Sequence, residues 1–132
     1  MKKRGRPIIY KTEIDRNIRK LQLSKSDLKN ISFSVFKDWY SKQKDCCAYC
    51  DVSSRESLLL FEKYPKSTRN GKRGKSLELD RKDPLITDYS ILENLCLACY
   101  WCNNAKTNYF SFEEFKLIGS TINKIQRNKI KL

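Results

Sequence analysis

The sequence predicts an α+β fold, in which a structural zinc ion holds together a small ββα unit that is flanked by helices. Two Cys-x-x-Cys pairs, Cys47 with Cys50 and Cys99 with Cys102, have the spacing of zinc knuckles and can together close one tetrahedral four-thiolate site. Between the pairs, residues 77–80 alternate apolar and acidic side chains in the manner of a half-buried strand. Helix-capping patterns recur on both sides of this central part.

Two helices are expected before the first cysteine pair. Thr12 can cap a helix that runs to Leu23, because acidic residues follow in its first turn and apolar residues recur at helical spacing. Either Ser32 or Ser34 can cap a second helix that ends near Gln43, and the pattern does not choose between these two caps.

Two capping boxes start further helices. Ser53 and Glu56 form the first box, and Ser111 and Glu114 form the second, which opens a C-terminal helix. The expected apolar face of the C-terminal helix consists of Phe115, Ile118, Ile122 and Ile125.

Four segments make up the expected ββα unit. A strand at 77–80 and a loop at 84–93 are followed by a short strand at 95–98 and a helix at 100–108. The second cysteine pair leads this helix, so a structural zinc would pin the unit to the first cysteine pair.

Two of the six cysteines leave the zinc ligands ambiguous. Cys46 adjoins the pair 47–50, and Cys96 has Cys-x-x-Cys spacing to the first member of the pair 99–102. We take the pair 47–50 for its tight knuckle spacing, and we exclude Cys96 because it lies in the expected second strand. The roles of Cys46 and Cys96 stay open.

The length and composition of the chain limit its domain organisation and its cellular compartment. The 132 residues suit one compact domain, residues 31–132, preceded by a basic arm with a short helix, residues 1–30. The chain has no apolar run that could span a membrane and no apolar signal core, which favours the cytoplasm. In that compartment closely spaced cysteines bind metal more often than they form disulfides.

The charge of the chain points to a polyanionic partner. Lysine and arginine number 28 against 15 acidic residues, a net charge of +13, so nucleic acid is the expected partner. A basic protein without such a partner is the alternative, but the charge here is segregated rather than mixed. The chain has no histidine, which excludes imidazole as a zinc ligand or general base.

Two basic segments are candidates for contact with DNA. Arg4 and Arg6 form an Arg-Gly-Arg-Pro sequence that resembles the core of an AT-hook, whose arginines enter narrow A/T minor grooves; a disordered basic tail fits these residues equally well. Residues 65–75 hold five basic residues, two glycines and no acid, which suits a loop that contacts DNA, although a plain flexible loop would need no partner. The residues of this loop that we expect to bind DNA are Arg69, Lys72, Arg73 and Lys75.

The centre of the ββα unit carries the residue types that phosphodiester hydrolysis needs. That reaction uses a metal held by oxygen ligands, an activated nucleophile and a cation that offsets the developing charge. Asp80 and Asn103 offer a carboxylate and an amide oxygen, which suit magnesium or manganese. Arg81 and Lys106 supply positive charge, and Lys106 is also a candidate DNA contact.

These residues resemble a known family. Asp80-Arg81, Asn94 and Cys99-x-x-Cys102-Asn103-x-x-Lys106, with the upstream cysteine pair, are similar to the HNH nucleases, also called ββα-metal or His-Me finger nucleases. The family pattern is Asp-His, then a structural asparagine, then Cys-x-x-Cys-Asn/His-x-x-Lys. The chain departs from it at Arg81, which stands where the general-base histidine is expected.

A narrower resemblance covers residues from about 33 to 125. The motifs that carry it are Phe36-x-x-Trp39-Tyr40, Cys47-x-Tyr49-Cys50, Leu79-Asp80-Arg81-x-Asp83, Tyr89-Ser90-x-x-x-Asn94 and Leu97-Ala98-Cys99-x-x-Cys102-Asn103-x-x-Lys106-x-Asn108. They look like the PacI-like type II restriction endonucleases, in which arginine replaces the base histidine and a tyrosine is the nucleophile or its activator. The resemblance implies that role for Tyr40, metal ligation by Asp80 and Asn103, and a structural role in a loop for Asn94.

The phenol of Tyr40 would need activation before it could take part in catalysis. A phenol with a pKa of about 10 is a poor nucleophile at neutral pH, and a nearby arginine and metal ion would favour the phenolate. The phenolate would then attack phosphorus directly, or it would orient or deprotonate a water molecule. The sequence leaves both routes open, and without the resemblance Tyr40 would be taken as an aromatic core residue.

The resemblance therefore implies a metal-dependent, site-specific double-strand DNA endonuclease of a restriction system. We expect a homodimer, because cutting both strands of a palindrome requires two sites related by a two-fold axis. The alternatives are an HNH homing or nicking endonuclease and a catalytically inactive zinc module that only binds DNA, which the missing histidine favours.

Overall fold

The computed structural model describes residues 12–69 and 73–131 of the chain. They fall into two compact units: residues up to Gln43 together with Asp88–Leu92, and the remainder. The predicted DNA contacts Arg4, Arg6 and Lys72 lie outside the described residues.

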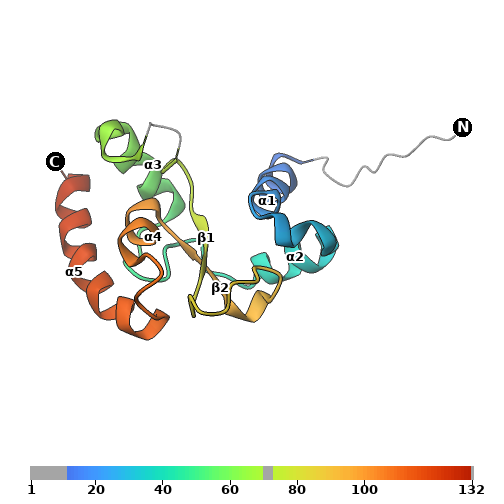
Figure 1. The fold of residues 1–132 in the computed structure, drawn as a ribbon. Helices are drawn as coiled ribbons and strands as arrows, with labels where there is room; N and C mark the ends of the chain where they lie inside the picture. Colours follow the sequence, from blue (N-terminus) through green and yellow to red (C-terminus); the bar gives the residue numbers. More distant parts are fainter. Residues whose placement is uncertain (1–11, 70–72, 132) are drawn as a thin grey trace, which may run out of the picture. The chain divides into compact units, whose positions relative to one another are not determined.

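The first unit is helical. Its elements are α1 (Glu13–Leu23), the 3₁₀ helix η1 (Ser26–Asn30) and α2 (Phe33–Ser41) (Figure 1). Thr12 caps α1 as predicted, and Ser32 rather than Ser34 caps α2 through its hydroxyl oxygen. Segment 88–92 joins this unit because the backbone N–H of Tyr89 donates to Asp27 at 2.9 Å.

The second unit holds the ββα core. Its elements are α3 (Ser54–Lys63), the 3₁₀ helix η2 (Pro65–Ser67), β1 (Glu78–Arg81), β2 (Leu95–Ala98), α4 (Tyr100–Lys106) and α5 (Phe112–Lys131); the one-turn 3₁₀ helix η4 (Leu92–Asn94) leads into β2. Strands β1 and β2 pair antiparallel, with Glu78 opposite Ala98 and Arg81 opposite Leu95. Helix α4 follows β2 directly, and α5 runs beside α3 (Figure 1). The predicted α+β fold with a ββα core is confirmed.

Local sequence signals place most helix starts correctly. Both predicted capping boxes are formed: Glu56 caps back to Ser53 at the start of α3, and Glu114 caps back to Ser111 at the start of α5. The predicted helix at 100–108 ends earlier, at Lys106, because Thr107 adopts φ 54°, outside the helical range.

The predicted apolar face of α5 was partly wrong. Ile118 and Ile125 are 37% and 50% exposed, whereas Gly119 is buried against the loop that carries the first cysteine pair. A Cβ atom at Gly119 would lie 2.3 Å from the carbonyl oxygen of Tyr49. The helix is therefore rotated so that a residue without a side chain faces the loop, which hydrophobicity alone does not predict.

Among the described residues, no helix combines the length and the apolar character needed to cross a membrane.

Candidate functional site

Four cysteines from two distant segments meet in the second unit. The Sγ atoms of Cys47, Cys50, Cys99 and Cys102 all lie within 4.8 Å of one another, and all four residues are buried. The Cys50 and Cys99 sulfurs are 3.7 Å apart, too far for a disulfide and close to the spacing of about 3.8 Å that tetrahedral zinc bonds of about 2.3 Å would give. This is the zinc-ligand set predicted from the sequence, and its geometry fits a structural zinc with no open coordination position.

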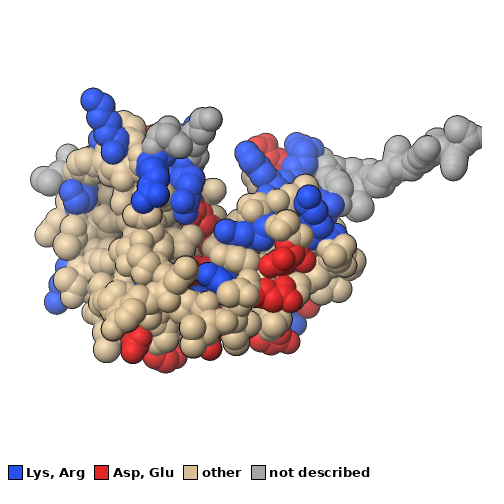
Figure 2. All heavy atoms as spheres, viewed as in Figure 1, with Lys and Arg blue, Asp and Glu red and all other residues tan. Residues whose placement is uncertain are grey.

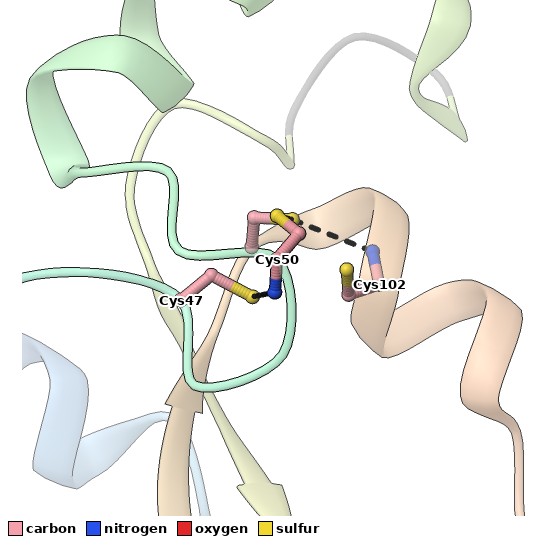
Figure 3. Close-up of side chains that lie close together, drawn as sticks. Cys47, Cys50 and Cys102 are labelled. Carbon is pink, nitrogen blue, oxygen red and sulfur yellow. Dashed lines mark hydrogen bonds between the residues drawn. The ribbon is translucent and has the colours of Figure 1, made fainter. Parts of the chain in front are cut away.

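Backbone N–H groups support these sulfurs. The amide of Cys50 donates to Cys47 Sγ at 3.5 Å, and the amide of Cys102 donates to Cys99 Sγ at 3.4 Å. Figure 3 shows the first pair on the loop before α3 and Cys102 on the first turn of α4. Donors aimed at sulfur stabilise thiolates, the form that binds metal.

Hydrogen bonds within the cluster lower the pKa of one thiol and raise the pKa of another. Hydrogen bonds from Cys102, Cys50 and Cys99 hold the pKa of Cys47 far below that of an ordinary thiol, and hydrogen bonds to Cys47, Cys50 and Cys99 raise the pKa of Cys102. A zinc ion deprotonates the thiols that coordinate it, so it suits a cluster that otherwise has to share protons.

The two remaining cysteines lie outside the cluster. Cys46 Sγ donates to Asp51 at 3.2 Å, and burial and this contact raise the pKa of Cys46 to about 11. Cys96 lies in β2 and donates to the Tyr49 hydroxyl at 3.5 Å; burial raises the pKa of Cys96 to about 12. Neither sulfur is a member of the four-sulfur group.

Asp80 is held in the interior by two donors. Its Oδ2 accepts a hydrogen bond of 2.6 Å from the Tyr49 hydroxyl and pairs with Lys106 Nζ at 3.3 Å. Lys106 has no exposed surface, and its Nζ also donates to the carbonyl oxygen of Arg81 at 2.8 Å. We therefore place Lys106 inside the site and remove it from the expected DNA contacts, because a fully buried ammonium cannot reach a phosphate.

One face of β1 looks toward one face of α4. Glu78 and Asp80 are two residues apart in the strand and so share a face, as Asn103 and Lys106, three apart, share a face of the helix. Asn103 Nδ2 donates to Glu78 at 2.9 Å, while Lys106 reaches Asp80. The amide nitrogen of Asn103 is thus hydrogen-bonded within the protein, and its amide oxygen is of the type that binds hard cations.

Arg73 joins the same network from the basic loop. Its Nε and Nη2 donate to the two carboxylate oxygens of Glu78 at 3.0 and 2.6 Å, which raises the pKa of Arg73. Arg69, Arg73 and Lys75 are exposed, as DNA contacts must be. On the visible face of the second unit, several Lys and Arg side chains gather toward the upper edge of the view (Figure 2).

Arg81 and Asn94 flank the loop between β1 and β2, and both side chains form hydrogen bonds. Arg81 Nη2 donates to Asn108 Oδ1 at 3.0 Å. Asn94 Oδ1 accepts from the backbone of Asp83 at 3.0 Å, and its Nδ2 donates back to the Asp83 carbonyl at 3.2 Å. These contacts tie Asn94 to Asp83 in the loop, and its structural role stays a prediction.

Tyr40 lies in the first unit, where it is half-buried on α2. Asp80, Arg81 and Asn103 lie in the second unit. The catalytic role of Tyr40 stays a prediction.

Sequence reasoning missed two members of the site, Tyr49 and Glu78. The strand alternation that marks Asp80 also places Glu78 on the same face, so this position was readable from the pattern. The contact of Tyr49 with Asp80 spans 31 residues of sequence, so the Cys-x-Tyr-Cys motif that contains Tyr49 does not reveal it.

An antiparallel strand pair, a helix that directly follows it, and a cysteine cluster that can hold zinc are the parts of the ββα-metal fold of the HNH class. Among solved structures, the chain is similar to the rare-cutting HNH restriction endonuclease PacI, with a TM-score of 0.60 and 28% sequence identity over 86% of this chain and 77% of the PacI chain. The predicted PacI-like HNH resemblance is thereby confirmed. No protein-family model matches the chain, and a search of curated proteins finds no relative.

Proposed function

We propose that this protein is a metal-dependent, site-specific double-strand DNA endonuclease of the restriction type. The observation that carries the proposal is the pair of oxygen donors, Asp80 and Asn103, on facing elements of a fold similar to that of a restriction endonuclease. The net charge of +13 supports double-stranded DNA as the partner.

Two metals have separate roles in the proposed mechanism. Zinc on the four cysteines is structural, because four thiolates leave no position for substrate. Asp80 and Asn103 would hold magnesium or manganese, which supplies Lewis-acid polarisation of a phosphoryl oxygen. Asp80, kept in place by Tyr49 and Lys106, needs no reorganisation to present its carboxylate.

Arg81 and Tyr40 take the roles that histidine has in the common HNH pattern. The Arg81 guanidinium is always charged and offsets charge that develops on the phosphate. Tyr40 either attacks phosphorus, with water later releasing the phosphotyrosine ester, or positions the water that attacks. The products in both cases are a phosphate end and a hydroxyl end.

The proposed working form is a homodimer in the cytoplasm. Two copies related by a two-fold axis provide one site for each strand of a palindrome. Among the described residues none of the six cysteines forms a disulfide, which suits the reducing compartment that we propose.

Cleavage of plasmid DNA in magnesium tests the proposal. We expect Tyr40→Phe, Arg81→Ala and Asp80→Ala each to lower the cleavage rate by about 100-fold or more, as loss of a catalytic group does. Tyr109→Phe is the matched control, because Tyr109 is 80% exposed and has no assigned role, and it should cleave like the wild type. Retained cleavage by all three site variants would contradict the site.

The same assay separates the other functions. Binding without cleavage in magnesium or manganese would identify a zinc module that only binds DNA. Accumulation of nicked circles by a monomer, with the cut ends mapped by sequencing, would identify a nicking or homing enzyme.

A further inference from the structure

Tyr49 joins the zinc knuckle to Asp80. It lies in sequence between Cys47 and Cys50, and its backbone N–H donates to Cys47 Sγ at 3.4 Å. Its hydroxyl, at the other end of the side chain, donates to Asp80 Oδ2 at 2.6 Å. One residue therefore contacts both a zinc ligand and the carboxylate that would bind the second metal.

The side chain of Tyr49 has little freedom to move. It is 5% exposed, and its ring packs against Phe112 and Phe115 with centroid distances of 5.4 and 5.2 Å. Its backbone carbonyl lies against Gly119 so closely that no Cβ fits between them. The position of the hydroxyl is thus fixed by the knuckle and by α5 rather than by the Asp80 contact alone.

Both contacts of the Asp80 carboxylate involve Oδ2, so Oδ1 remains available to a metal ion. Tyr49 and Lys106 both reach Oδ2, and no other described residue forms a hydrogen bond or ion pair with the carboxylate. The Tyr49 hydroxyl also accepts from Cys96 at 3.5 Å, so its own proton is directed to Asp80. Oδ1 is therefore the oxygen that can bind a cation, and the rotation of the carboxylate is set by Oδ2.

We propose that Tyr49 is a positioning residue, which fixes the Asp80 carboxylate so that Oδ1 binds the divalent metal and which ties that geometry to the zinc knuckle. This inference rests on the proposed function, because it assumes that Asp80 binds the metal. Removing the hydroxyl lets the carboxylate rotate about its own bond and lowers the affinity for the metal, while the ring continues to fill the core.

Manganese binding by the zinc-loaded protein, without DNA, tests this role. Titration followed by electron paramagnetic resonance gives the Kd of Mn²⁺ for wild type, Asp80→Ala and Tyr49→Phe. Partners that orient a metal ligand are typically worth about 10–100-fold in metal affinity, so we expect a loss of that size in Tyr49→Phe. Zinc content and Tm, measured on the same samples, should stay near the wild-type values.

Tyr100→Phe is the matched control. Tyr100 is also buried beside a zinc ligand, between Cys99 and Cys102, but its hydroxyl accepts the backbone N–H of Arg69 at 3.0 Å and has no contact with Asp80. It should keep the wild-type affinity for Mn²⁺. An equal loss in both tyrosine variants would mean a general effect of knuckle packing and would overturn the inference.

The remaining outcomes separate this inference from the proposed function. If Asp80→Ala abolishes Mn²⁺ binding but Tyr49→Phe binds like wild type, Tyr49 has no positioning role and the nuclease proposal stands. If Asp80→Ala leaves Mn²⁺ binding unchanged, both fail. If Tyr49→Phe loses zinc, a structure of the wild-type protein with bound Mn²⁺ provides the test instead. Mn²⁺ on Asp80 Oδ1, with the Tyr49 hydroxyl still bonded to Oδ2, would support the positioning role. Mn²⁺ on Oδ2 would overturn it.

Discussion

Gly119 determines how closely α5 approaches the loop of the first cysteine pair. An alanine methyl at this position would lie 2.3 and 2.6 Å from the carbonyl oxygen and carbon of Tyr49, which are backbone atoms that cannot rotate away. The better helix propensity of alanine, worth about 1 kcal/mol, opposes an overpacking cost of about 1–3 kcal/mol. We expect the clash to dominate, so that Gly119→Ala lowers the free energy of unfolding in urea by up to about 2 kcal/mol.

Ser120→Ala is the control for this prediction. Ser120 is exposed on the same helix, so its substitution should change stability by less than about 0.5 kcal/mol. A Gly119→Ala variant as stable as the wild type would show that the loop can move away from α5.

The Lys106–Asp80 pair is the most deeply buried ion pair among the described residues. Breaking a buried pair leaves an uncompensated charge, so we expect Lys106→Met to destabilise the protein by about 3–5 kcal/mol. Asp80→Asn should destabilise the Lys106→Met variant less than it destabilises the wild-type protein. In a double-mutant cycle measured by denaturant unfolding, we expect a coupling energy of about 1–3 kcal/mol between the two residues.

Burial is what makes this pair costly to break, and Lys42 provides the comparison. Lys42 and Asp38 form an ion pair of 3.2 Å, close to the 3.3 Å of Lys106 and Asp80, but both side chains are more than two-thirds exposed. Lys42→Met should therefore cost no more than about 1 kcal/mol. Equal losses in the two variants would argue against a buried Lys106.

At the scale of elements, capping residues and ligand spacing close together in the sequence predict the helices and strands well. The predictions that fail depend on contacts between residues far apart in the sequence. Capping residues at Ser53 and Ser111 act within one helical turn, so the sequence places these helix starts correctly. The cluster of four cysteines is likewise predictable from the sequence, because zinc chemistry restricts residue type and spacing. The buried face of α5 and the contact of Tyr49 with Asp80 depend on partners many residues away, which no local pattern encodes.

The four-cysteine cluster joins the loop at 47–50 to the start of α4. The adjacent Cys46 allows a test of which cysteines bind zinc. We expect Cys46→Ser to retain one zinc per chain, because its sulfur lies outside the four-sulfur group and contacts Asp51 instead. Cys102→Ser should lose zinc and unfold at lower temperature, since metal binding contributes folding free energy. Metal analysis and thermal unfolding provide the measurements, and zinc loss from Cys46→Ser would shift the ligand set by one residue.

Helices α3 and α5 are joined by Glu56 and Arg127, and this pair should make stability depend on pH. The hydrogen bond from Arg127, followed by the backbone N–H of Ser53, lowers the pKa of Glu56 below its ordinary 4.5. Because the folded-state pKa is the lower one, the stabilisation is complete above about pH 4.5 and is lost as pH falls through the folded-state value.

Unfolding in urea at neutral and acidic pH measures this contribution. Arg127→Met should be less stable than wild type by about 0.5–1 kcal/mol at pH 7, since both side chains are partly exposed, and the difference should shrink at pH 3. Arg55→Met, at an exposed position of α3, should show no such pH-dependent difference. A gap that persists unchanged at pH 3 would assign the effect of Arg127 to packing instead.

At the scale of the whole molecule, the net charge of +13 should appear as a salt-dependent affinity for DNA. Each phosphate contact contributes about 0.9 to the slope of log K against log salt, because binding releases counterions. Lys66→Gln/Arg69→Gln/Lys75→Gln removes three exposed charges from the basic loop, so we expect the slope to fall by up to about 2.7. Arg73 stays unchanged because it pairs with Glu78 beside the site.

A second triple variant with the same loss of charge separates the loop from general attraction. Lys116→Gln/Lys124→Gln/Lys131→Gln removes three exposed charges from α5, and both triples are compared in the Asp80→Ala background, so that cleavage does not disturb the binding assay. A larger change for the loop triple means that the loop lies on the phosphates, since only contacted charges release counterions at the site. Equal changes for the two triples would instead mean that the charge of the whole protein attracts DNA, and the loop would lose its assigned role.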